Sequence, residues 1–423
     1  MKEDFLHYVW KHQLFSKKKL LTTSNHKIEI VKPGVHNFNS GPDFGNATIL
    51  IDNLRWVGNV EIHIQSSDWY VHQHEQDERY DSVILHVVWE YNVEVFDQNN
   101  QHIPTLELAK LIDNKLLHSY QDLIFADKGW VPCESSISSI DSFLLERWKT
   151  RLYFERLEGK SLLIQKLLDE TKNDYEAVLF KLLLKNFGLK ANGDAFLNLA
   201  NSFPFSMVQK LQNYPDKLAA LLFGQAGFLE EVIEEGYYTS MQEEYRYLKK
   251  KLGLSSIYNK QFQFFRMRPT NFPTIRIAQI AALYGQRQNL FSSLMESKNL
   301  NDFYELFAIT LAPYWNTHYT FYKVSPSSVK RITKSFVDLL LINTIIPLKF
   351  NYLKSRSAVD EEVFLELLYQ LKPEKNSIIS KFLDLGIHSK NAFESQALLQ
   401  LKSNYCSKKQ CLQCAIGNAI LKE

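Results

Sequence analysis

The sequence predicts an α+β/α organisation, with a mixed β-sheet and flanking helices in residues 1–130 and an all-helical domain in residues 131–423. Two observations predict this division. Short runs rich in Val, Ile and aromatic residues fill the front, whereas apolar residues recur with a helical period beyond Trp130. Ten of the 12 histidines also lie between His7 and His118, so the candidate chemistry is expected in the front part.

The front part predicts a helix, three strands, a short helix and then further strands. Phe5, Val9 and Leu14 recur at near-helical spacing and indicate a helix over residues 3–15. Turn residues separate the β-type runs, among them the hairpin signal Asp52-Asn53. Strands are predicted at 26–32, 43–52, 55–64, 82–97 and 103–108, with the short helix at about 73–80.

The rear part contains amphipathic stretches, several of which end at Gly or Pro. They are found at residues 142–170, 174–188, 215–235, 243–253 and 360–371. The apolar run 336–348 is interrupted by Asp338 and Asn343, so it predicts a buried helix and not a membrane span. The turn-rich stretch 125–140 is the expected boundary between the two domains.

Composition limits the class of protein. The chain has 423 residues, 45% of them hydrophobic, and its net charge is +2. This length and apolar content are enough for two or three domains with a large core. Residues 1–130 carry 12 basic and 18 acidic side chains, so the rest of the chain is basic. Such a split suits a metal site beside a surface for an anionic polymer, although chance also produces it. With no secretion signal, no membrane span and few cysteines, we expect a cytoplasmic protein.

Two carboxylates are predicted to converge on neighbouring strands. Asp43 opens one strand, and Glu61 follows the hairpin turn on the next. With a rise of about 3.3 Å per residue, both lie at similar heights on strands about 5 Å apart. Because side chains alternate along a strand, Glu61 and His63 share a face. The three residues are the candidate catalytic group, and the two carboxylates are candidate ligands of Mg²⁺ or Mn²⁺.

The pattern Asp43 … Glu61-Ile62-His63 resembles the core of the PD-(D/E)xK nucleases, as does the order of helix, three strands, helix and strand. The resemblance implies two metal-binding acids and a lysine that orients or activates water. His63 occupies the position of that lysine, and this departure puts the catalytic role in doubt. Some members take a further acidic residue from the first helix, and Glu3 or His7 could fill that position here.

A second group of candidate metal ligands follows closely in the chain. These side chains are His72, His74, Asp77 and His86. Imidazole and carboxylate are standard Zn²⁺ ligands, so this group could join the carboxylate pair or form a zinc site by itself. The competing interpretation is that each histidine is an ordinary core or surface residue.

Three of the four cysteines fall within nine residues near the end of the chain. They are Cys406, Cys411 and Cys414, and the fourth is Cys133. Four thiolates complete either a tetrahedral Zn²⁺ site or the ligand set of an iron–sulfur cluster, and the sequence leaves both open. The alternative is four unrelated buried thiols.

A basic stretch with interleaved aromatic residues lies in the helical part. Its candidate nucleic-acid-binding residues are Lys249, Lys250, Lys251, Arg266 and Arg268. Cationic side chains neutralise phosphates and aromatic rings stack on bases, but solvated helix faces have the same composition.

Distinctive strings along the whole chain are similar to a bacterial family known as domain of unknown function 2851. They include GPDFGNATI, WVGNVEIH, RPTNFPTIRIAQIAAL and NYCSKKQCLQCAIGNAIL. Three functions are therefore weighed: a metal-dependent nuclease acting on DNA or RNA, a non-catalytic scaffold of the same fold that binds nucleic acid or a protein partner, and a His/Asp zinc hydrolase. Whether the protein is an enzyme, and which protein partner it has, stay open.

Overall fold

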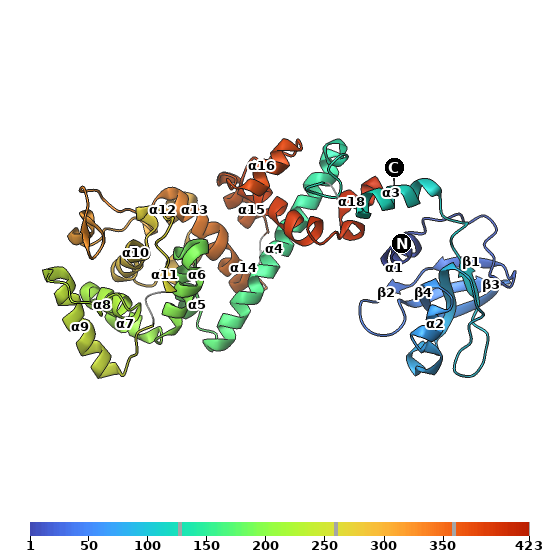
Figure 1. The fold of residues 1–423 in the computed structure, drawn as a ribbon, viewed down its shortest axis with the longest axis horizontal. Coiled ribbons are helices and arrows are strands. Elements are labelled where there is room, and N and C mark those ends of the chain that lie inside the picture. Colours follow the sequence, from blue (N-terminus) through green and yellow to red (C-terminus); the bar gives the residue numbers. More distant parts are fainter. Residues whose placement is uncertain (126–128, 258–260, 358–360, 423) are drawn as a thin grey trace. The chain divides into compact units, whose positions relative to one another are not determined.

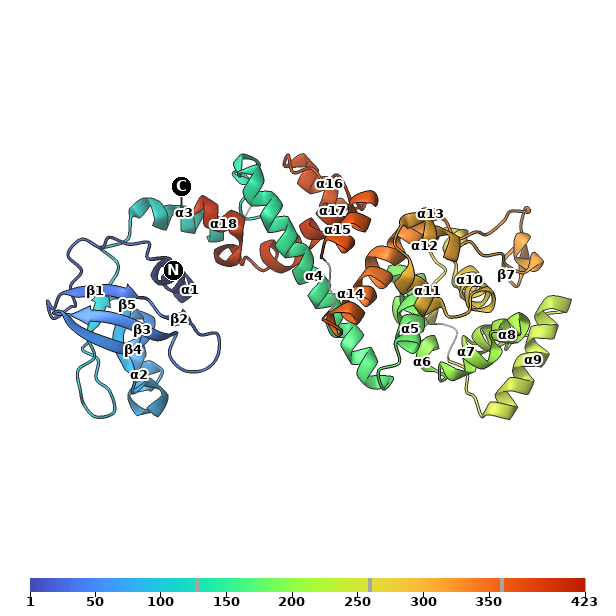
Figure 2. The same ribbon diagram turned by 180° about the vertical axis from the view of Figure 1, so that it is seen from behind.

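The computed structural model describes residues 1–125, 129–257, 261–357 and 361–422 (Figure 1 and Figure 2). The chain divides into two compact units. The first unit contains residues 1–150, 380–388 and 398 to the C-terminal end, and the second contains 151–379 and 389–397. The first unit thus extends past the predicted boundary at residue 130 and includes the C-terminal segment. The predicted linker falls partly on residues 126–128, outside the described residues.

The predicted mixed sheet with flanking helices is confirmed in the first unit (Figure 1). Its strands are β1 (Ile28–Lys32), β2 (Val35–His36), β3 (Phe44–Ile51), β4 (Leu54–Gln65), β5 (Val83–Glu90) and β6 (Thr105–Glu107), with helices α1 (Glu3–His12), α2 (Asp68–Val71) and α3 (Asn114–Phe125). The strand order is β1-β3-β4-β5-β6, and β2 pairs with β3. The β1–β3 and β3–β4 pairs are antiparallel, whereas β4–β5 and β5–β6 are parallel.

The turn between β3 and β4 fixes the register of the sheet. Asp52 and Asn53 have φ values of 49° and 68°, in the left-handed region that these residue types tolerate. The turn pairs Ile51 with Leu54 and Ala47 with Gly58, and a one-residue register shift between Phe44 and Ala47 then places Phe44 opposite Val60. Asp43, just before β3, is thereby brought beside Glu61.

The predicted strand at 82–97 is too long, because β5 ends at Glu90. The segment after β5 is held by side chains near α2 and does not continue the ladder. Ser66 Oγ accepts hydrogen bonds from the backbone N–H groups of Asn92 (3.0 Å) and Val93 (2.9 Å). Side-chain anchoring of this kind has no periodic signal in the sequence.

Helix α1 packs its apolar face against the sheet. Phe5, Leu6, Val9 and Trp10 are fully buried, and α1 contacts β4. Trp10 Nε1 donates to the carbonyl of Pro33 (2.9 Å), which fixes the helix beside the loop before β2. His7 then lies within reach of Asp43.

The second unit is mainly helical, as predicted. The helices after α3 are α4 (Ser142–Glu170), α5 (Tyr175–Phe187), α6 (Leu189–Asn201), α7 (Ser206–Leu211), α8 (Pro215–Gln225), α9 (Gly236–Leu252), α10 (Pro273–Gln286), α11 (Leu290–Glu296), α12 (Leu300–Leu306), α13 (Lys334–Leu340), α14 (Ile346–Lys354), α15 (Glu361–Gln370), α16 (Ser377–Asp384), α17 (Ala392–Gln400) and α18 (Ala415–Ile420). The last of these belongs to the first unit, and α4, α16 and α17 each cross the division between the units.

Two predictions for the rear part need correction. It is not all helical, because β7 (His318–Thr320) and β8 (Lys323–Val324) form a short antiparallel pair, too short for a periodic signal. The predicted helix at 215–235 ends at Gln225, because Gly227 adopts a φ of +76°, which a continuing right-handed helix excludes.

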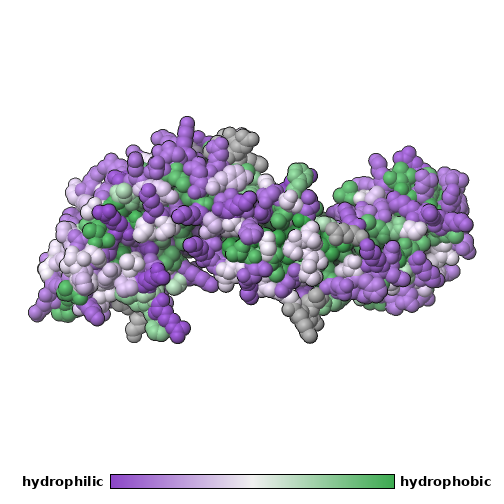
Figure 3. All heavy atoms as spheres, turned by 90° about the horizontal axis from the view of Figure 1, so that it is seen from above, coloured by the Kyte–Doolittle hydropathy of each residue, from purple (hydrophilic) through white to green (hydrophobic). Residues whose placement is uncertain are grey.

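The apolar stretch 336–348 forms helices α13 and α14, joined by a π-helical turn at Leu341–Ile345. Among the described residues, one helical stretch, Lys334–Lys354, is long and apolar enough to cross a membrane, and 72% of its most apolar window is buried in the protein. Such burial is typical of a core helix. On the face shown in Figure 3, hydrophilic side chains predominate and apolar ones are interspersed among them.

Lys160 on α4 lies against this π-helical turn. Its Nζ donates to the carbonyl of Ile342 (3.0 Å) and to Asn343 Oδ1 (3.1 Å). The residue keeps some exposed surface, but its ammonium group is enclosed by protein. Burial, with the nearby charge of Arg156, lowers the pKa of Lys160 to about 7.

We expect Lys160→Met to remove a pH dependence of stability. Lysine in the unfolded chain has a pKa of about 10.4, so between pH 7 and 9 the unfolded state binds more protons than the folded state. Raising the pH through this window should therefore raise the free energy of unfolding, by at most about 1.4 kcal/mol per pH unit. Urea unfolding of both proteins at several pH values measures the difference. Parallel pH profiles would contradict the expectation.

Candidate functional site

Asp43 and Glu61 are tied together through each other's backbone. Glu61 Oε2 accepts a hydrogen bond from the N–H of Asp43 (3.1 Å). Asp43 Oδ2 accepts one from the N–H of Ile62 (3.0 Å) and lies 3.1 Å from His7 Nε2 on α1. The two carboxylates named by the sequence are thus neighbours, and the first helix adds a histidine to them.

Burial and mutual repulsion make this carboxylate pair receptive to positive charge. Burial, followed by the negative charge of Asp43, raises the pKa of Glu61 well above its ordinary value. Burial alone would lower the pKa of His7, but the hydrogen bond and charge of Asp43 outweigh it, so the pKa of His7 is raised. Glu61 and His7 therefore tend to bind protons, and a metal cation could take the place of those protons.

Three histidines lie together beside Glu61, and two of them contact its carboxylate. His63 follows Glu61 by two positions on β4 and shares its face. Its Nε2 lies 3.1 Å from His72 Nδ1 and 3.6 Å from Glu61 Oε1. His74 Nε2 lies 3.4 Å from the same oxygen. One ligand atom from each of His63, His72 and His74 lies within 4.8 Å of the other two.

The three histidines lie close enough together to share one ion, and Glu61 contacts two of them. Metal–nitrogen bonds of 2.0–2.1 Å in a tetrahedral arrangement separate neighbouring ligand atoms by about 3.4 Å. The measured contacts are 3.1, 3.4 and 3.6 Å. Three imidazoles with one carboxylate suit Zn²⁺, Mn²⁺ or Fe²⁺ better than Mg²⁺, which prefers oxygen ligands.

His86 on β5 supports His63 from behind. His86 Nε2 lies 2.8 Å from His63 Nδ1, and both rings are buried. Burial, reinforced by neighbouring histidines, lowers the pKa of His63 to about 2 and that of His86 to about 3, so both are neutral at physiological pH. A His63 tautomer that donates from Nδ1 leaves the Nε2 lone pair free for a ligand bond.

Helix α2 lies against the sheet (Figure 1). A core that includes two buried aromatic residues holds it there. Trp69 is fully buried, its Nε1 donates to the carbonyl of Phe96 (3.1 Å), and its ring packs against His74 and His86. Tyr80 stacks on His74 with ring centroids 3.7 Å apart. Sequence reasoning missed Trp69 and Tyr80, because buried aromatic residues carry no signal that separates a supporting ring from ordinary core.

Asp77 does not join the other predicted ligands. Its carboxylate accepts hydrogen bonds from the side chain and backbone of Arg79. The hydrogen-bonded partner lies only two residues away, on an exposed turn. A local ion pair of this kind competes with any role as a ligand.

The five predicted nucleic-acid-binding residues belong to the second unit. Lys249, Lys250 and Lys251 lie in the last turn of α9, and the exposed Arg266 and Arg268 precede the 3₁₀ turn Pro269–Asn271. Three of them pair with neighbouring aromatic rings, Lys249 with Tyr245, Lys251 with Tyr247 and Arg266 with Phe265. Three aromatic rings of the predicted nucleic-acid-binding stretch thus already contact cationic side chains of the protein itself.

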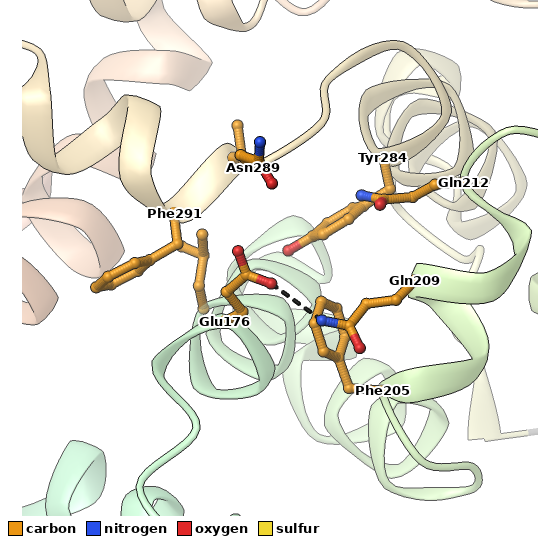
Figure 4. Close-up of a pocket in the computed structure, with 9 residues that line it drawn as sticks. Glu176, Phe205, Gln209, Gln212, Tyr284, Asn289 and Phe291 are labelled. Carbon is orange, nitrogen blue, oxygen red and sulfur yellow. Dashed lines mark hydrogen bonds between the residues drawn. The ribbon is translucent and has the colours of Figure 1, made fainter.

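A separate pocket in the second unit has different chemistry (Figure 4). Glu176 and Tyr284 are the ionisable side chains that line it, and Gln209 Nε2 donates to Glu176 Oε2 (3.1 Å). Its lining includes neither histidine nor cysteine. The donor set expected for a metal site is therefore found in the first unit.

A family model described as "protein of unknown function (DUF2851)" matches residues 3–377, which include all of the carboxylate and histidine site. The chain belongs to the DUF2851 family. No curated protein and no solved structure matches it. The function of this DUF2851 protein is therefore inferred from the geometry of the site.

Proposed function

We propose that the first unit is a metal-dependent hydrolase of phosphodiester bonds in DNA or RNA. Its resident ion would be Mn²⁺ or Zn²⁺, held by His63, His72 and His74 together with Glu61. The observation that carries the proposal is that one ligand atom from each of the three histidines, which come from two segments of the chain, lies within 4.8 Å of the other two. Glu61 Oε1 lies 3.4 Å from His74 Nε2 and 3.6 Å from His63 Nε2. Glu61 and His63 are buried and His74 is half-buried, whereas His72 is exposed.

The phosphodiester substrate is supported by the arrangement around the ion site. The order is α1, the strands β1, β3 and β4 with the two-residue β2 among them, α2 and a parallel β5, which is close to the order that the resemblance to PD-(D/E)xK nucleases implies. Asp43 and Glu61 take the positions of the two acids. His63 takes the position of the lysine but is neutral, so it serves as a ligand and cannot supply a permanent positive charge.

The remaining residues have roles that follow from their charge. A bound divalent ion supplies Lewis acidity toward a phosphoryl oxygen. His7, with its raised pKa, can hold a proton beside Asp43 and so provide the positive charge that His63 lacks. Asp43 orients His7 and can accept a proton from an attacking water. His86 positions His63 without touching the substrate.

The metal ligands can be tested one at a time. We expect His74→Gln to weaken Mn²⁺ and Zn²⁺ binding by at least about 100-fold, since the loss of an outer partner alone typically costs 10–100-fold. Cleavage of labelled single- and double-stranded DNA and RNA should fall in parallel. Calorimetric titration of the metal-free protein and gel assays measure the two effects. His102→Gln, which changes an exposed histidine outside the site, is the matched control.

Two outcomes would contradict the proposal. Unchanged metal affinity in His74→Gln would show that the ion is not held here. Tight metal binding by the wild type without cleavage of any nucleic acid, with either ion, would leave a metal-binding scaffold in place of a nuclease.

A further inference from the structure

The four cysteines come from distant parts of the chain but lie in the same unit. Cys133 precedes α4, Cys406 ends a π-helical turn (Leu401–Cys406), Cys411 begins a 3₁₀ turn, and Cys414 immediately precedes α18. More than 270 residues separate Cys133 from Cys406. None of the four forms a disulfide, and all are buried.

All four side chains line one small cavity. The rest of its wall is largely apolar and includes Leu123, Pro132, Leu401 and Ile416. Each thiol is close enough to the other three for their charges to interact. Burial, followed by these neighbours, raises the pKa of Cys133 and of Cys411 to about 12. Four isolated core thiols would have no reason to converge on one point.

The backbone around this cavity is closely fitted. A Cβ atom at Gly417 would lie 2.2 Å from the carbonyl oxygen of Cys411, so only glycine lets α18 approach that loop. Asn418 Nδ2 donates to the carbonyls of Cys414 (2.8 Å) and Leu412 (3.2 Å). These contacts hold two of the cysteines in a fixed turn.

Two cationic side chains lie near the cysteines, Lys402 near Cys406 and Lys409 near Cys411. Lys402 Nζ also donates to the carbonyl of Trp130 (2.7 Å), which keeps the ammonium group close to the segment that carries Cys133. Positive charge near thiolates stabilises an anionic metal–thiolate centre.

We propose that Cys133, Cys406, Cys411 and Cys414 ligate a [4Fe–4S] cluster. The four thiols release their protons to solvent as their sulfur atoms bind iron. The proposal is independent of the nuclease function, because it concerns a different set of side chains. Its structural consequence is that the cluster joins the C-terminal segment to the segment before α4 within the first unit.

The spacing of the sulfur atoms favours a cluster over a single ion. One zinc ion, with Zn–S bonds of about 2.3 Å, requires its four sulfur atoms to lie about 3.8 Å apart. Among the described residues, the only group of three or more possible ligands whose ligand atoms all lie within 4.8 Å of one another is the histidine group. No three of the cysteine sulfur atoms are therefore within 4.8 Å of one another. A cluster places iron and sulfide between its thiolates and so separates them more widely. Apolar, buried walls also protect such a cluster from solvent.

The test is the metal content and spectrum of the full chain purified without oxygen. We expect brown protein with about four iron and four sulfide atoms per chain and a broad absorption at about 400 nm. Each single Cys→Ser variant should lose most of this absorption, whereas Ser407→Ala, an exposed neighbour of Cys406, should keep it. Reduction with dithionite followed by electron paramagnetic resonance distinguishes a cluster from iron bound at the histidines.

The wild-type protein alone can overturn the proposal, so the result does not depend on whether a variant folds. Colourless protein with about one zinc per chain, lost in the cysteine variants, would replace the cluster by a structural zinc ion. The absence of iron and zinc after anaerobic purification and after reconstitution with iron and sulfide would show that the cavity binds no metal centre.

Discussion

Replacing Glu61 by glutamine is expected to abolish nucleic-acid cleavage and to weaken Mn²⁺ or Zn²⁺ binding by more than about 100-fold. The amide keeps the shape of the side chain but removes the charge that faces His63 and His74. The side chain is 5% exposed, so solvent cannot supply an equivalent anion. The loss should appear in kcat, because the charge contributes to the ion that acts on the phosphoryl group.

The same substitution should not unfold the metal-free protein. A carboxylate buried beside Asp43 opposes folding whenever it is ionised, as the raised pKa of Glu61 shows. The melting temperature of metal-free Glu61→Gln at pH 7 should therefore equal or exceed that of the wild type. Glu29→Gln, on the exposed face of β1, is the control for losing a carboxylate from this sheet. Full cleavage activity in Glu61→Gln would refute the role of Glu61 as a ligand.

The sequence could predict the elements that repeat a local pattern. The helical period of residues 142–170 matches α4 in both bounds, because a long amphipathic helix needs no distant partner to be recognised. The Asp52-Asn53 turn was equally informative, since two left-handed residues in a tight hairpin set the register of β3 against β4. That register puts Asp43 and Glu61 at similar heights, and the register shift between Phe44 and Ala47 sets them directly side by side.

The rest of the site depends on contacts that no local pattern encodes. His72 reaches His63 and His74 reaches Glu61 because Trp69 anchors their segment to the carbonyl of Phe96, 27 residues further along the chain. Asp77 lies in the same segment but turns to Arg79, and residue type alone could not separate it from its neighbours. The convergence of Cys133 with the C-terminal cysteines is likewise a long-range contact.

The site also depends on the close approach of β4 and β5, which gives a second prediction of large effect. A Cβ atom at Gly58 would lie 2.5 Å from the carbonyl oxygen of Ser82 and 2.4 Å from Ile84 Cγ2. The N–H of Asn59 donates to that carbonyl (2.8 Å), at the point where the parallel pairing begins. Backbone atoms cannot move aside as a flexible side chain can, so any larger residue must push the strands apart.

We therefore expect Gly58→Ala to lower the free energy of unfolding of the first unit by about 2–3 kcal/mol. The usual effect of Gly→Ala inside a strand has the opposite sign, since alanine stabilises by about 0.5–1 kcal/mol. Gly45→Ala on β3, where the added Cβ meets only Asn59 Oδ1 at 3.8 Å, is the matched control and should be neutral or stabilising. Urea unfolding of both variants gives the two free energies.

The same variant links the packing of the sheet to the metal site. His63 lies on β4 and His86 on β5, and their 2.8 Å contact spans the two strands. Separating the strands should break this contact and release the His63 ring, so metal affinity should fall by at least about 10-fold even where Gly58→Ala is still folded. Gly45→Ala should bind metal like the wild type. A folded, destabilised Gly58→Ala with unchanged metal affinity would show that His86 does not orient His63.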